Sequence, residues 1–521
     1  MAERSEELVD GVLRKATSEV GLDVEYVRAE GNTLFARGRD GSEVPVSDYL
    51  GGFGALLLGH NHPDLVAGLI DRLRRGAPVL TQLSLAPQAN EVVDTLNRVL
   101  RREFGVDEPY FGVFANSGAE GVEVAVKHAE LDRALRAAEL LAEVDANADA
   151  ALAAPGAEVD ASALGLPAGT PVAEVVALLR ERNAATLADP PRLVALEGGF
   201  HGKLMGSGQL THNPDYRLPF TPLGARALFA PADADGLRAV LEGARATVHD
   251  LRVTADRIEV VPRDAPVFCA LLLEPVQGEG GIVPLPAEFA KRVQELSAEF
   301  GCPVVVDEIQ SGAGRTGAFF AASQLGLLGD YVVLSKSLGG GLAKLSVTLV
   351  RASRYRAEFE MLHSSTFGKD GLSTSVAAAV LDLLEADGGA LYRVVAERGE
   401  RLGAALRAVR DDHPDVIADV RGLGLLRGVE FADLSTSGSA LAADLQAQGR
   451  FGFLASGYLL HEHRVRLFPT GSAPSTLRLQ PSVQVTDEEI DRLATGLRAL
   501  CALLRDGDDA GLTAFAGARA F

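Results

Sequence analysis

An acid and a lysine, each close to the end of an apolar run, are the residues of this sequence best suited to chemistry. The run Val304–Val306 leads directly into Asp307, and the run Tyr331–Leu334 leads within two residues to Lys336. Both runs are typical of buried strands whose C-terminal ends present one charged group. A lysine amine can form an imine with an aldehyde, and a carboxylate can hold a protonated ring nitrogen. These are the two protein groups that the chemistry of pyridoxal 5'-phosphate (PLP) most needs.

Two glycine-containing turns in the first half of the chain add groups suited to holding a cofactor. Asn116–Glu120 follows the apolar run Phe111–Phe114 and precedes a helical pattern, an arrangement that captures phosphate on free N–H groups. The alternative is a plain turn with Ser117 as a helix N-cap. In Glu197–Lys203, glycines let the backbone approach a ligand closely, and they flank an aromatic ring able to stack on a flat cofactor. The histidine of this loop has a structural interpretation as well as a catalytic one.

A third turn places two carboxylates near each other at the end of a strand. Glu274 and Glu279 belong to the glycine-rich segment Glu274–Gly281, directly after the apolar run Phe268–Leu273. Two acids five residues apart at a strand end are more typical of a functional site than of packing. Solvated acids in a plain turn are the alternative.

The composition favours a globular enzyme and argues against several other classes. The chain has 521 residues, 47% hydrophobic content and a net charge of -21. This charge argues against nucleic acid and against anionic membrane surfaces as partners, because there is no basic surplus. The first residues lack a signal-peptide pattern, and no run of about 18 apolar residues predicts a membrane span. The three cysteines suggest neither disulfides nor a metal site, so we expect a cytoplasmic enzyme without a bound metal.

The order of helical and apolar segments predicts two domains of different architecture. From about residue 80 to 355 the two alternate, which predicts an α/β domain with a mostly parallel sheet and with ligand groups at the C-terminal ends of its strands. Residues 356–521 predict a smaller α+β domain, which residues 1–79 are expected to join. Residues 131–190 interrupt the pattern with 19 alanines in 60 positions. We interpret them as an inserted helical hairpin with helices at Leu131–Glu143 and Val172–Ala184, either a surface elaboration or a lid or partner surface.

Nine short motifs occur in the order in which a known family has them. The sequence resembles class III aminotransferases of PLP fold type I, the group that includes ornithine, acetylornithine and 4-aminobutyrate aminotransferases. The resemblance runs from about Gly31 to Arg498, without the insertion. In chain order the motifs are GHNHP, NSGAEGVEVAVK, GFHGK, EPVQGEGGI, VVVDEIQSGAGRTG, SKSLGGG, STFG, RGLGLLRGVEF and LRLQPS.

This resemblance implies how PLP would be held. Lys336 would carry the cofactor as an imine and then move the proton between the substrate Cα and the cofactor C4′. Asp307 would pair with the ring nitrogen and keep it protonated, so that the ring accepts electrons. The other implied cofactor contacts are Gln310 on the phenolic oxygen, Phe200 stacked on the ring with His201 beside it, Ser117, Gly118 and Ala119 on the phosphate, and Glu274 near cofactor and substrate.

The resemblance also implies the partners of the site. Thr366 would reach the phosphate of a neighbouring subunit, so the enzyme would be a homodimer with shared active sites. Arg478 would take a substrate α-carboxylate, and Glu279 would pair with Arg478 when no carboxylate is bound. A lone arginine in a strand can also belong to a structural ion pair. The substrates would be an amino donor and a keto acid or aldehyde, converted by a ping-pong mechanism.

Two loops depart from the family pattern. Ala343-Lys344 replaces the proline that usually follows the glycines after the lysine, and Lys369–Gly371 replaces a Gly-Asn-Pro. With the insertion, these departures suggest an enzyme of a specialised biosynthetic pathway. Because Lys336 and Asp307 serve every PLP carbanion, decarboxylation, racemisation and carbon–carbon bond formation are alternatives to transamination. A catalytically inactive binding protein is disfavoured, because both residues and Gln310 are present.

Overall fold

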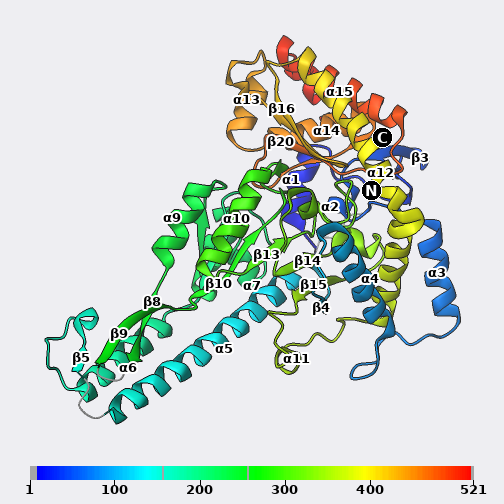
Figure 1. Ribbon diagram of the computed structural model, residues 1–521. Coiled ribbons are helices and arrows are strands. Elements are labelled where there is room, and N and C mark those ends of the chain that lie inside the picture. The colour runs from blue at the N-terminus through cyan, green and yellow to red at the C-terminus, as the bar shows by residue number, and fades with distance from the viewer. Residues whose placement is uncertain (1–8, 155–157, 255–256, 518–521) are drawn as a thin grey trace.

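A seven-stranded sheet forms the centre of the molecule (Figure 1). The computed structural model describes residues 9–154, 158–254 and 257–517. In sheet order the strands are β4 (Tyr110–Ala115), β15 (Ser346–Arg351), β14 (Tyr331–Leu334), β13 (Val304–Asp307), β10 (Phe268–Leu273), β6 (Arg192–Leu196) and β7 (Ala227–Ala230). All pairs from β14 to β7 are parallel, and only β15 is antiparallel to its neighbours. The predicted mostly parallel sheet is therefore confirmed.

Helices cover both faces of this sheet. They are α4 (Pro87–Phe104), α5 (Gly118–Ala153), α9 (Ala234–Ala244), α10 (Ala287–Phe300) and the short α7 (Met205–Gln209). The short α8 (Pro214–Arg217) has no buried residue and lies beside α7 in the segment after β6. Leu272 and Val305 pack with the first half of α5, whereas the adjacent Leu271 and Val304 pack with α9 and α10. Successive strand residues point to opposite faces, so continuous apolar runs are required, and the sequence has them.

An N-terminal segment and a C-terminal segment of the chain share one sheet. One sheet has the order β1 (Tyr26–Glu30), β2 (Thr33–Arg37), β3 (Glu43–Asp48), β18 (Val465–Arg466). Another has the order β16 (Ile417–Leu423), β17 (Leu426–Phe431), β20 (Thr476–Leu479), β19 (Phe468–Pro469). Two-residue strands β11 (Val276–Gln277) and β12 (Val283–Pro284) form a separate hairpin. Val465 lies opposite Ser47 in a parallel pair, so segments more than four hundred residues apart share one sheet.

The remaining helices surround these smaller sheets. They are α1 (Gly11–Glu19), α2 (Gly51–Gly54), α3 (Pro63–Arg74), α11 (Phe359–Leu362), α12 (Gly371–Asp412), α13 (Ala440–Ala447), α14 (Phe451–His463), α15 (Asp487–Asp506) and α16 (Asp509–Thr513). Short 3-10 turns are η1 (Ser162–Leu164), η2 (Leu218–Leu223), η3 (Ala321–Leu325), η4 (Lys336–Gly339), η5 (Leu434–Thr436) and η6 (Ala514–Gly517). In the described ranges, no helix is long and apolar enough to cross a membrane.

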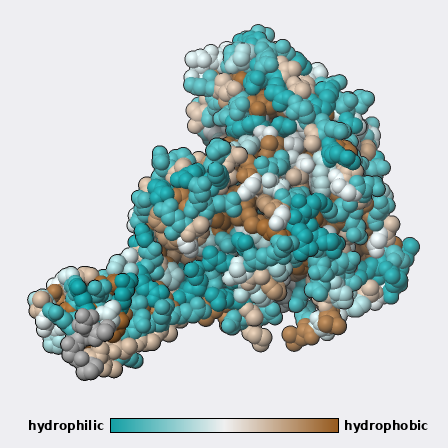
Figure 2. Space-filling view, viewed as in Figure 1, coloured by the Kyte–Doolittle hydropathy of each residue, from teal (hydrophilic) through white to brown (hydrophobic). Residues whose placement is uncertain are grey.

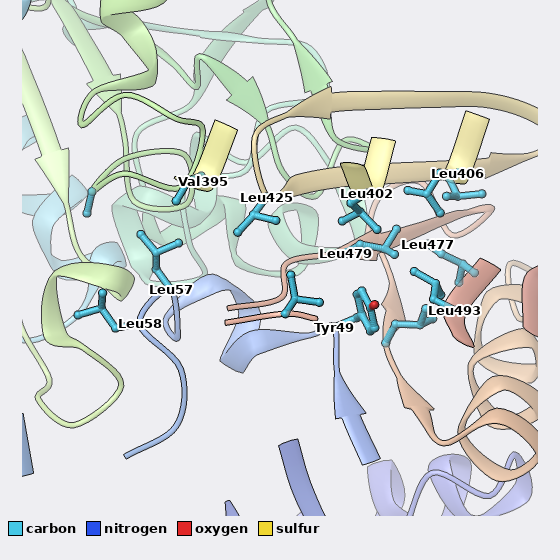
Figure 3. Packing of buried hydrophobic residues seen from close by; sticks show 14 of the residues in the cluster. Tyr49, Leu57, Leu58, Val395, Leu402, Leu406, Leu425, Leu477, Leu479 and Leu493 are labelled. Atoms are coloured by element: carbon cyan, nitrogen blue, oxygen red, sulfur yellow. The ribbon is translucent and has the colours of Figure 1, made fainter. Parts of the chain in front are cut away.

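One large apolar cluster joins the N-terminal segment to the C-terminal elements. Figure 3 shows side chains of this cluster packed together, among them Tyr49, Leu57, Leu58, Val395, Leu402, Leu425, Leu477 and Leu479. Those from α12 and β20 meet those that follow β3. Burial of this kind contributes roughly 25 cal/mol per Å² of apolar surface, and the same cluster includes Val347 and Leu349 of β15, so it joins these segments to the large sheet.

An arm projects from the body of the molecule (Figure 1). It is built from the second half of α5, α6 (Val172–Ala188) and a three-stranded sheet of β5 (Glu158–Asp160), β9 (Arg257–Asp264) and β8 (Thr247–Val253). The arm has an apolar core of its own, which includes Val144, Leu179 and Ile258. On the face that Figure 2 shows, its surface is largely hydrophilic.

The arm corrects part of the sequence interpretation. Two helices do pack in the insertion, but α5 continues to Ala153 instead of ending near Glu143. The segment between them, expected as a loop, contains β5 and η1, and its Pro155-Gly156 lies outside the described residues. The helical spacing of residues up to about Gly21 predicts a first helix, and its Leu8 also lies outside the described residues. A cavity of about 450 Å³ at the base of the arm touches Phe268, the first residue of β10. It therefore lies at the opposite end of the strands from the site described next.

Candidate active site

Lys336 and Asp307 lie close together at the C-terminal ends of adjacent strands. Asp307 is the last residue of β13, and the parallel register sets it opposite Val333, three residues before Lys336. The negative charge of Asp307 acts on the Lys336 ammonium. Lys336 has a φ of 41°, in the left-handed region that non-glycine residues rarely adopt. Backbone strain of this kind concentrates at functional sites.

The surroundings of Lys336 favour its neutral amine. Burial, and then the Arg478 cation, lower the pKa of Lys336 to about 8 against the opposing charges of Glu279, Asp307 and Glu274. A larger share of this amine is unprotonated near neutral pH than in a free lysine. The unprotonated amine is the form that attacks a carbonyl carbon.

Asp307 is held in place by two donors. Its Oδ1 accepts a hydrogen bond from the Ile309 amide at 3.0 Å, and its Oδ2 lies 2.9 Å from Nδ1 of His201. Burial disfavours the charged imidazole, but the hydrogen bond and charge of Asp307 outweigh it and raise the pKa of His201. Among the described residues, Nε2 of His201 and Nε2 of Gln310 are buried without a hydrogen-bond partner. Orphaned buried groups at one place indicate a site built to receive a polar ligand.

Glycines allow the backbone to close tightly around this centre. A Cβ on Gly278 would lie 1.8 Å from Oε1 of Gln310, and a Cβ on Gly202 would lie 2.6 Å from Cβ of Ala119. Glu274 joins two of these loops, because its carboxylate accepts from the amides of Phe200 and Gly278, each at 2.9 Å.

The carboxyl group of Glu274 has a raised pKa. Burial, opposed by His201 and reinforced by Asp307, raises the pKa of Glu274 to about 7. This group therefore titrates near neutral pH in the folded protein, whereas an exposed glutamate is already ionised there.

The turn before α5 has the form of an anion site. Ser117 is the N-cap, and a capping box links it to Glu120, whose carboxylate accepts from the amides of Asn116 at 2.6 Å and Ser117 at 3.1 Å. The amides of Gly118 and Ala119 open the helix, where N–H groups have no intrahelical acceptor. They and the helix dipole favour a phosphate at this point.

Arg478 forms an ion pair with Glu279 deep in the site. Arg478 is 2% exposed, and its Nη1 donates to Oε1 of Glu279. The other carboxylate oxygen accepts from the amide of Gly471 at 2.6 Å. Burial raises the pKa of Glu279, but Arg478 and the Gly471 amide together outweigh it, so the net shift is downward. The sequence-based pairing of the two residues is thus present in the geometry.

Two aromatic residues near this ion pair were not singled out from the sequence. The ring of Phe53 lies 4.9 Å from the Arg478 guanidinium carbon, and Phe53 has a φ of 55°. Tyr216 lies edge-on to Phe200, with ring centroids 6.0 Å apart. A bulky residue inside the glycine run before residue 55 was the available signal for Phe53. Tyr216 had no such signal, because its neighbours come from distant segments.

Thr366 is the one predicted site residue that stands apart from this group. It is exposed, and its carbonyl accepts from Nε2 of Gln82 at 2.8 Å. Its neighbour Ser365 accepts from the amide side chain of Asn116 at 3.0 Å, so this loop packs beside the anion turn of its own chain.

Comparison with known proteins identifies the class to which this fold and site belong. A family model described as aminotransferase class-III matches residues 15–500. The chain is 28% identical over 483 residues to an acetylornithine aminotransferase of Corynebacterium efficiens, covering 93% of each protein. It is 28% identical over 451 residues to a putrescine aminotransferase of Pectobacterium atrosepticum, covering 86% of this chain and 78% of the relative. Its fold is similar to an ornithine aminotransferase of Toxoplasma gondii, with a TM-score of 0.65, 23% identity and 93% and 90% coverage.

The chain belongs to the class III aminotransferases. It is a PLP-dependent enzyme that transfers an amino group from a donor to a keto acid or aldehyde acceptor. The site fits this cofactor, because it combines an amine, a carboxylate, two orphaned polar nitrogens and a helix N-terminus suited to a phosphate. The carbanion reactions that were kept as alternatives to transamination are not needed to explain any observation.

Proposed function

We propose that Lys336 is the residue that binds PLP and carries the proton of the transfer, with Asp307 as the partner of the cofactor's ring nitrogen. The observation that carries this proposal is the Lys336 amine, with a pKa lowered to about 8, in the field of Asp307 at the end of the adjacent strand. When bound, PLP supplies a ring that accepts the electrons released at the substrate Cα. Nζ of Lys336 would take up the proton that leaves the substrate Cα and would donate it back, because an amine with a pKa of about 8 can both accept and donate a proton near neutral pH.

The other roles are assigned from the contacts around this pair. His201 positions Asp307 through its Nδ1, and Glu274 positions two loops through its bridging carboxylate. The remaining proposed contacts are Gln310 on the phenolic oxygen, Phe200 on the ring face, and Ser117, Gly118 and Ala119 on the phosphate.

Arg478 is proposed to be the receptor for a substrate carboxylate. It is buried, charged and directed at one carboxylate already, that of Glu279. A substrate carboxylate that replaces Glu279 would form an ion pair with the guanidinium of Arg478. With Glu279 in place, the same site is neutral and accepts an amine without a carboxylate at that position. One site would thereby serve both halves of a ping-pong reaction.

A homodimer with shared sites is part of the proposal. Large apolar side chains are exposed near the loop of Thr366: Leu83, Leu85, Met361, Leu362 and Phe367. Exposed apolar residues in such numbers favour a protein interface. Thr366 would contribute its hydroxyl to the phosphate of the partner across that interface.

The proposal also covers organisation and pathway. The division into residues 1–79, a PLP-binding domain at 80–355 and a smaller domain at 356–521 is supported by the sheet that β3 and β18 share. The arm and the departures at Ala343-Lys344 and Lys369–Gly371 support a specialised biosynthetic pathway. A cytoplasmic location stays a prediction.

A donor and acceptor screen tests the assignment. Purified holoenzyme is incubated with amines that have or lack an α-carboxylate, and the absorbance of the lysine-bound cofactor is followed. At least one donor should deplete this band, and a 2-oxo acid should restore it. Borohydride reduction followed by mass spectrometry should place the cofactor on Lys336, should fail with Lys336→Ala and should succeed with the control Lys344→Ala. If the cofactor is found on another lysine, the assignment of Lys336 is wrong.

A further inference from the structure

Tyr216 lies between the proposed cofactor-stacking ring and the proposed carboxylate receptor. Its ring meets Phe200 edge-on at an interplanar angle of 81°, and the Lys203 ammonium lies 3.8 Å from its centroid. These contacts fix the direction of the ring. A Cβ on Gly471 would lie 2.8 Å from the Tyr216 hydroxyl and 3.0 Å from Oε2 of Glu279. The two oxygens therefore lie around one small space that only a glycine leaves open.

The segments that bring these groups together are bonded to one another. Nδ2 of Asn213, the N-cap of α8, donates to Oγ of Ser472 at 3.2 Å. The Ser472 amide donates to the carbonyl of Glu279 at 3.0 Å. Both bonds meet at Ser472, and the preceding Gly471 donates its amide to Oε2 of Glu279, so the segment of Tyr216 and the Glu279 carboxylate are held beside the same short turn.

Release of Glu279 from Arg478 leaves one of its oxygens without a donor. The Gly471 amide satisfies only Oε2, and a part-buried carboxylate oxygen with no donor is costly. Burial and the charge of Glu279 raise the pKa of Tyr216, so its hydroxyl keeps its proton and can donate. When the Glu279 side chain rotates away from Arg478, the Tyr216 hydroxyl can supply the hydrogen bond that its carboxylate has lost.

We propose that Tyr216 is the hydrogen-bond donor that receives Glu279 when a substrate carboxylate takes Arg478, which makes Tyr216 a specificity-determining residue. The inference rests on the proposed function, in which Arg478 is the carboxylate receptor. Gly471 is required for the same contact, because a side chain at that position would separate the Tyr216 hydroxyl from Oε2 of Glu279. Substrates that carry a carboxylate depend on Tyr216 through Glu279, and substrates without one do not open the pair.

Calorimetric titration of the holoenzyme with glutarate, a dicarboxylate, tests the proposal. Tyr216→Phe keeps the ring and removes the donor, so its affinity for glutarate should fall about tenfold, as expected for one hydrogen bond to a charged group. Gly471→Ala is a second variant and should weaken binding in the same direction. In an acceptor assay with 2-oxoglutarate, Tyr216→Phe should raise KM more than it changes kcat. Tyr355→Phe, which removes a hydroxyl bonded to Glu360 at 2.6 Å, is the matched control and should bind glutarate as the wild type does.

The double variant decides whether Tyr216 acts through Glu279. In a Glu279→Gln background, which has no charged carboxylate to receive, Tyr216→Phe should change the affinity less than twofold. The inference is overturned if Tyr216→Phe alone binds glutarate like the wild type, or if the loss persists in Glu279→Gln. If the wild-type holoenzyme binds no glutarate and uses no 2-oxo acid, Arg478 is not a carboxylate receptor. The proposed function of Arg478 is then wrong, and the inference about Tyr216, which rests on it, is wrong as well.

Discussion

The ring of Phe53 lies over the guanidinium of Arg478, 4.9 Å from its central carbon, on a backbone that an L-residue adopts only under strain. Phe53 has a φ of 55° and is 48% exposed, so packing alone does not explain its presence in a run of glycines. A cation–π contact contributes about 0.5–1 kcal/mol at an exposed site and about 2 kcal/mol when the charge is desolvated, and here a half-exposed ring meets a buried guanidinium. The strained backbone of Phe53 therefore places its ring against Arg478, the proposed carboxylate receptor.

Phe53→Gly should separate the strain from the contact. A left-handed non-glycine residue costs about 1 kcal/mol, so the free energy of unfolding should stay equal or rise by up to about that amount. Glutarate affinity should fall about threefold, because the ring no longer faces Arg478. Phe53→Ala, which loses the ring and keeps the strain, should be less stable than Phe53→Gly in urea denaturation.

Asp387→Gly is the control for this comparison. Asp387 is exposed, has a φ of 51° and lies in the kink of α12. It should relieve strain without any change in glutarate affinity. Equal affinities of Phe53→Gly and the wild type would mean that the ring has no part in carboxylate binding.

Burial of Lys336 should make the stability of the cofactor-free protein depend on alkaline pH. The folded pKa is lowered to about 8, against about 10.4 for an unfolded lysine. Between these values the unfolded chain binds more protons, so the free energy of unfolding should rise with pH, by about 3 kcal/mol in total. Below pH 8 Lys336 is charged in the folded protein, and the full destabilisation from burying this charge is present.

Lys336→Met removes the charge and keeps the length of the side chain. Denaturation of the cofactor-free variant should show no rise attributable to this residue between pH 8 and 10.5. Lys344→Met, at an exposed lysine, should keep the wild-type profile. A rise that survives in Lys336→Met would assign it to another group.

The central strands of the large sheet were predictable because β10, β13 and β14 are buried on both faces. Phe268–Leu273 and Tyr331–Leu334 are continuous apolar runs, and the structure gives them the same bounds as strands β10 and β14. The spacing of Thr486 and Glu489 predicts a capping box at the start of a helix, and α15 begins there with that capping box. Short-range signals were sufficient in these places.

What the sequence did not reveal depends on contacts between distant segments. β8 and β9 alternate polar and apolar residues and pair with the arm instead of the central sheet. The sequence from Ser439 onwards predicts one helix, whereas the structure has two there, α13 and α14. Phe53 acquires its role from Arg478, and Tyr216 from Gly471, residues far away in the chain. No local pattern encodes such pairs.

The arm should unfold locally before the rest of the molecule. Leu179 is 0% exposed in the separate core of the arm, and its replacement by alanine should cost about 2–4 kcal/mol there. Hydrogen exchange should quicken in peptides from residues 158–188 and 247–254, while the central strands keep their protection. The turnover number should stay within about twofold of the wild type.

Leu237→Ala is the matched control, because Leu237 is also 0% exposed but packs against the large sheet. The loss of stability caused by Leu237→Ala should appear in global denaturation as well as in hydrogen exchange. If Leu179→Ala lowers protection of the central strands as much as Leu237→Ala does, the arm is not a separate cooperative unit.

The bridge that Glu274 forms between Phe200 and Gly278 should weaken as pH rises towards 7. The folded pKa of Glu274 is raised to about 7, against about 4.3 for a solvated glutamate. The closed loops therefore bind more protons than the opened ones, and the stability that this contributes is lost as pH rises from about 4.5 to 7. Hydrogen exchange of the two amides, corrected for intrinsic rates, should report an opening free energy that falls by about 3 kcal/mol across this range. In Glu274→Gln, which cannot ionise, the fall should vanish, whereas Glu288→Gln, at an exposed position in α10, should leave it intact. An unchanged fall in Glu274→Gln would show that a different group sets the closure of these loops.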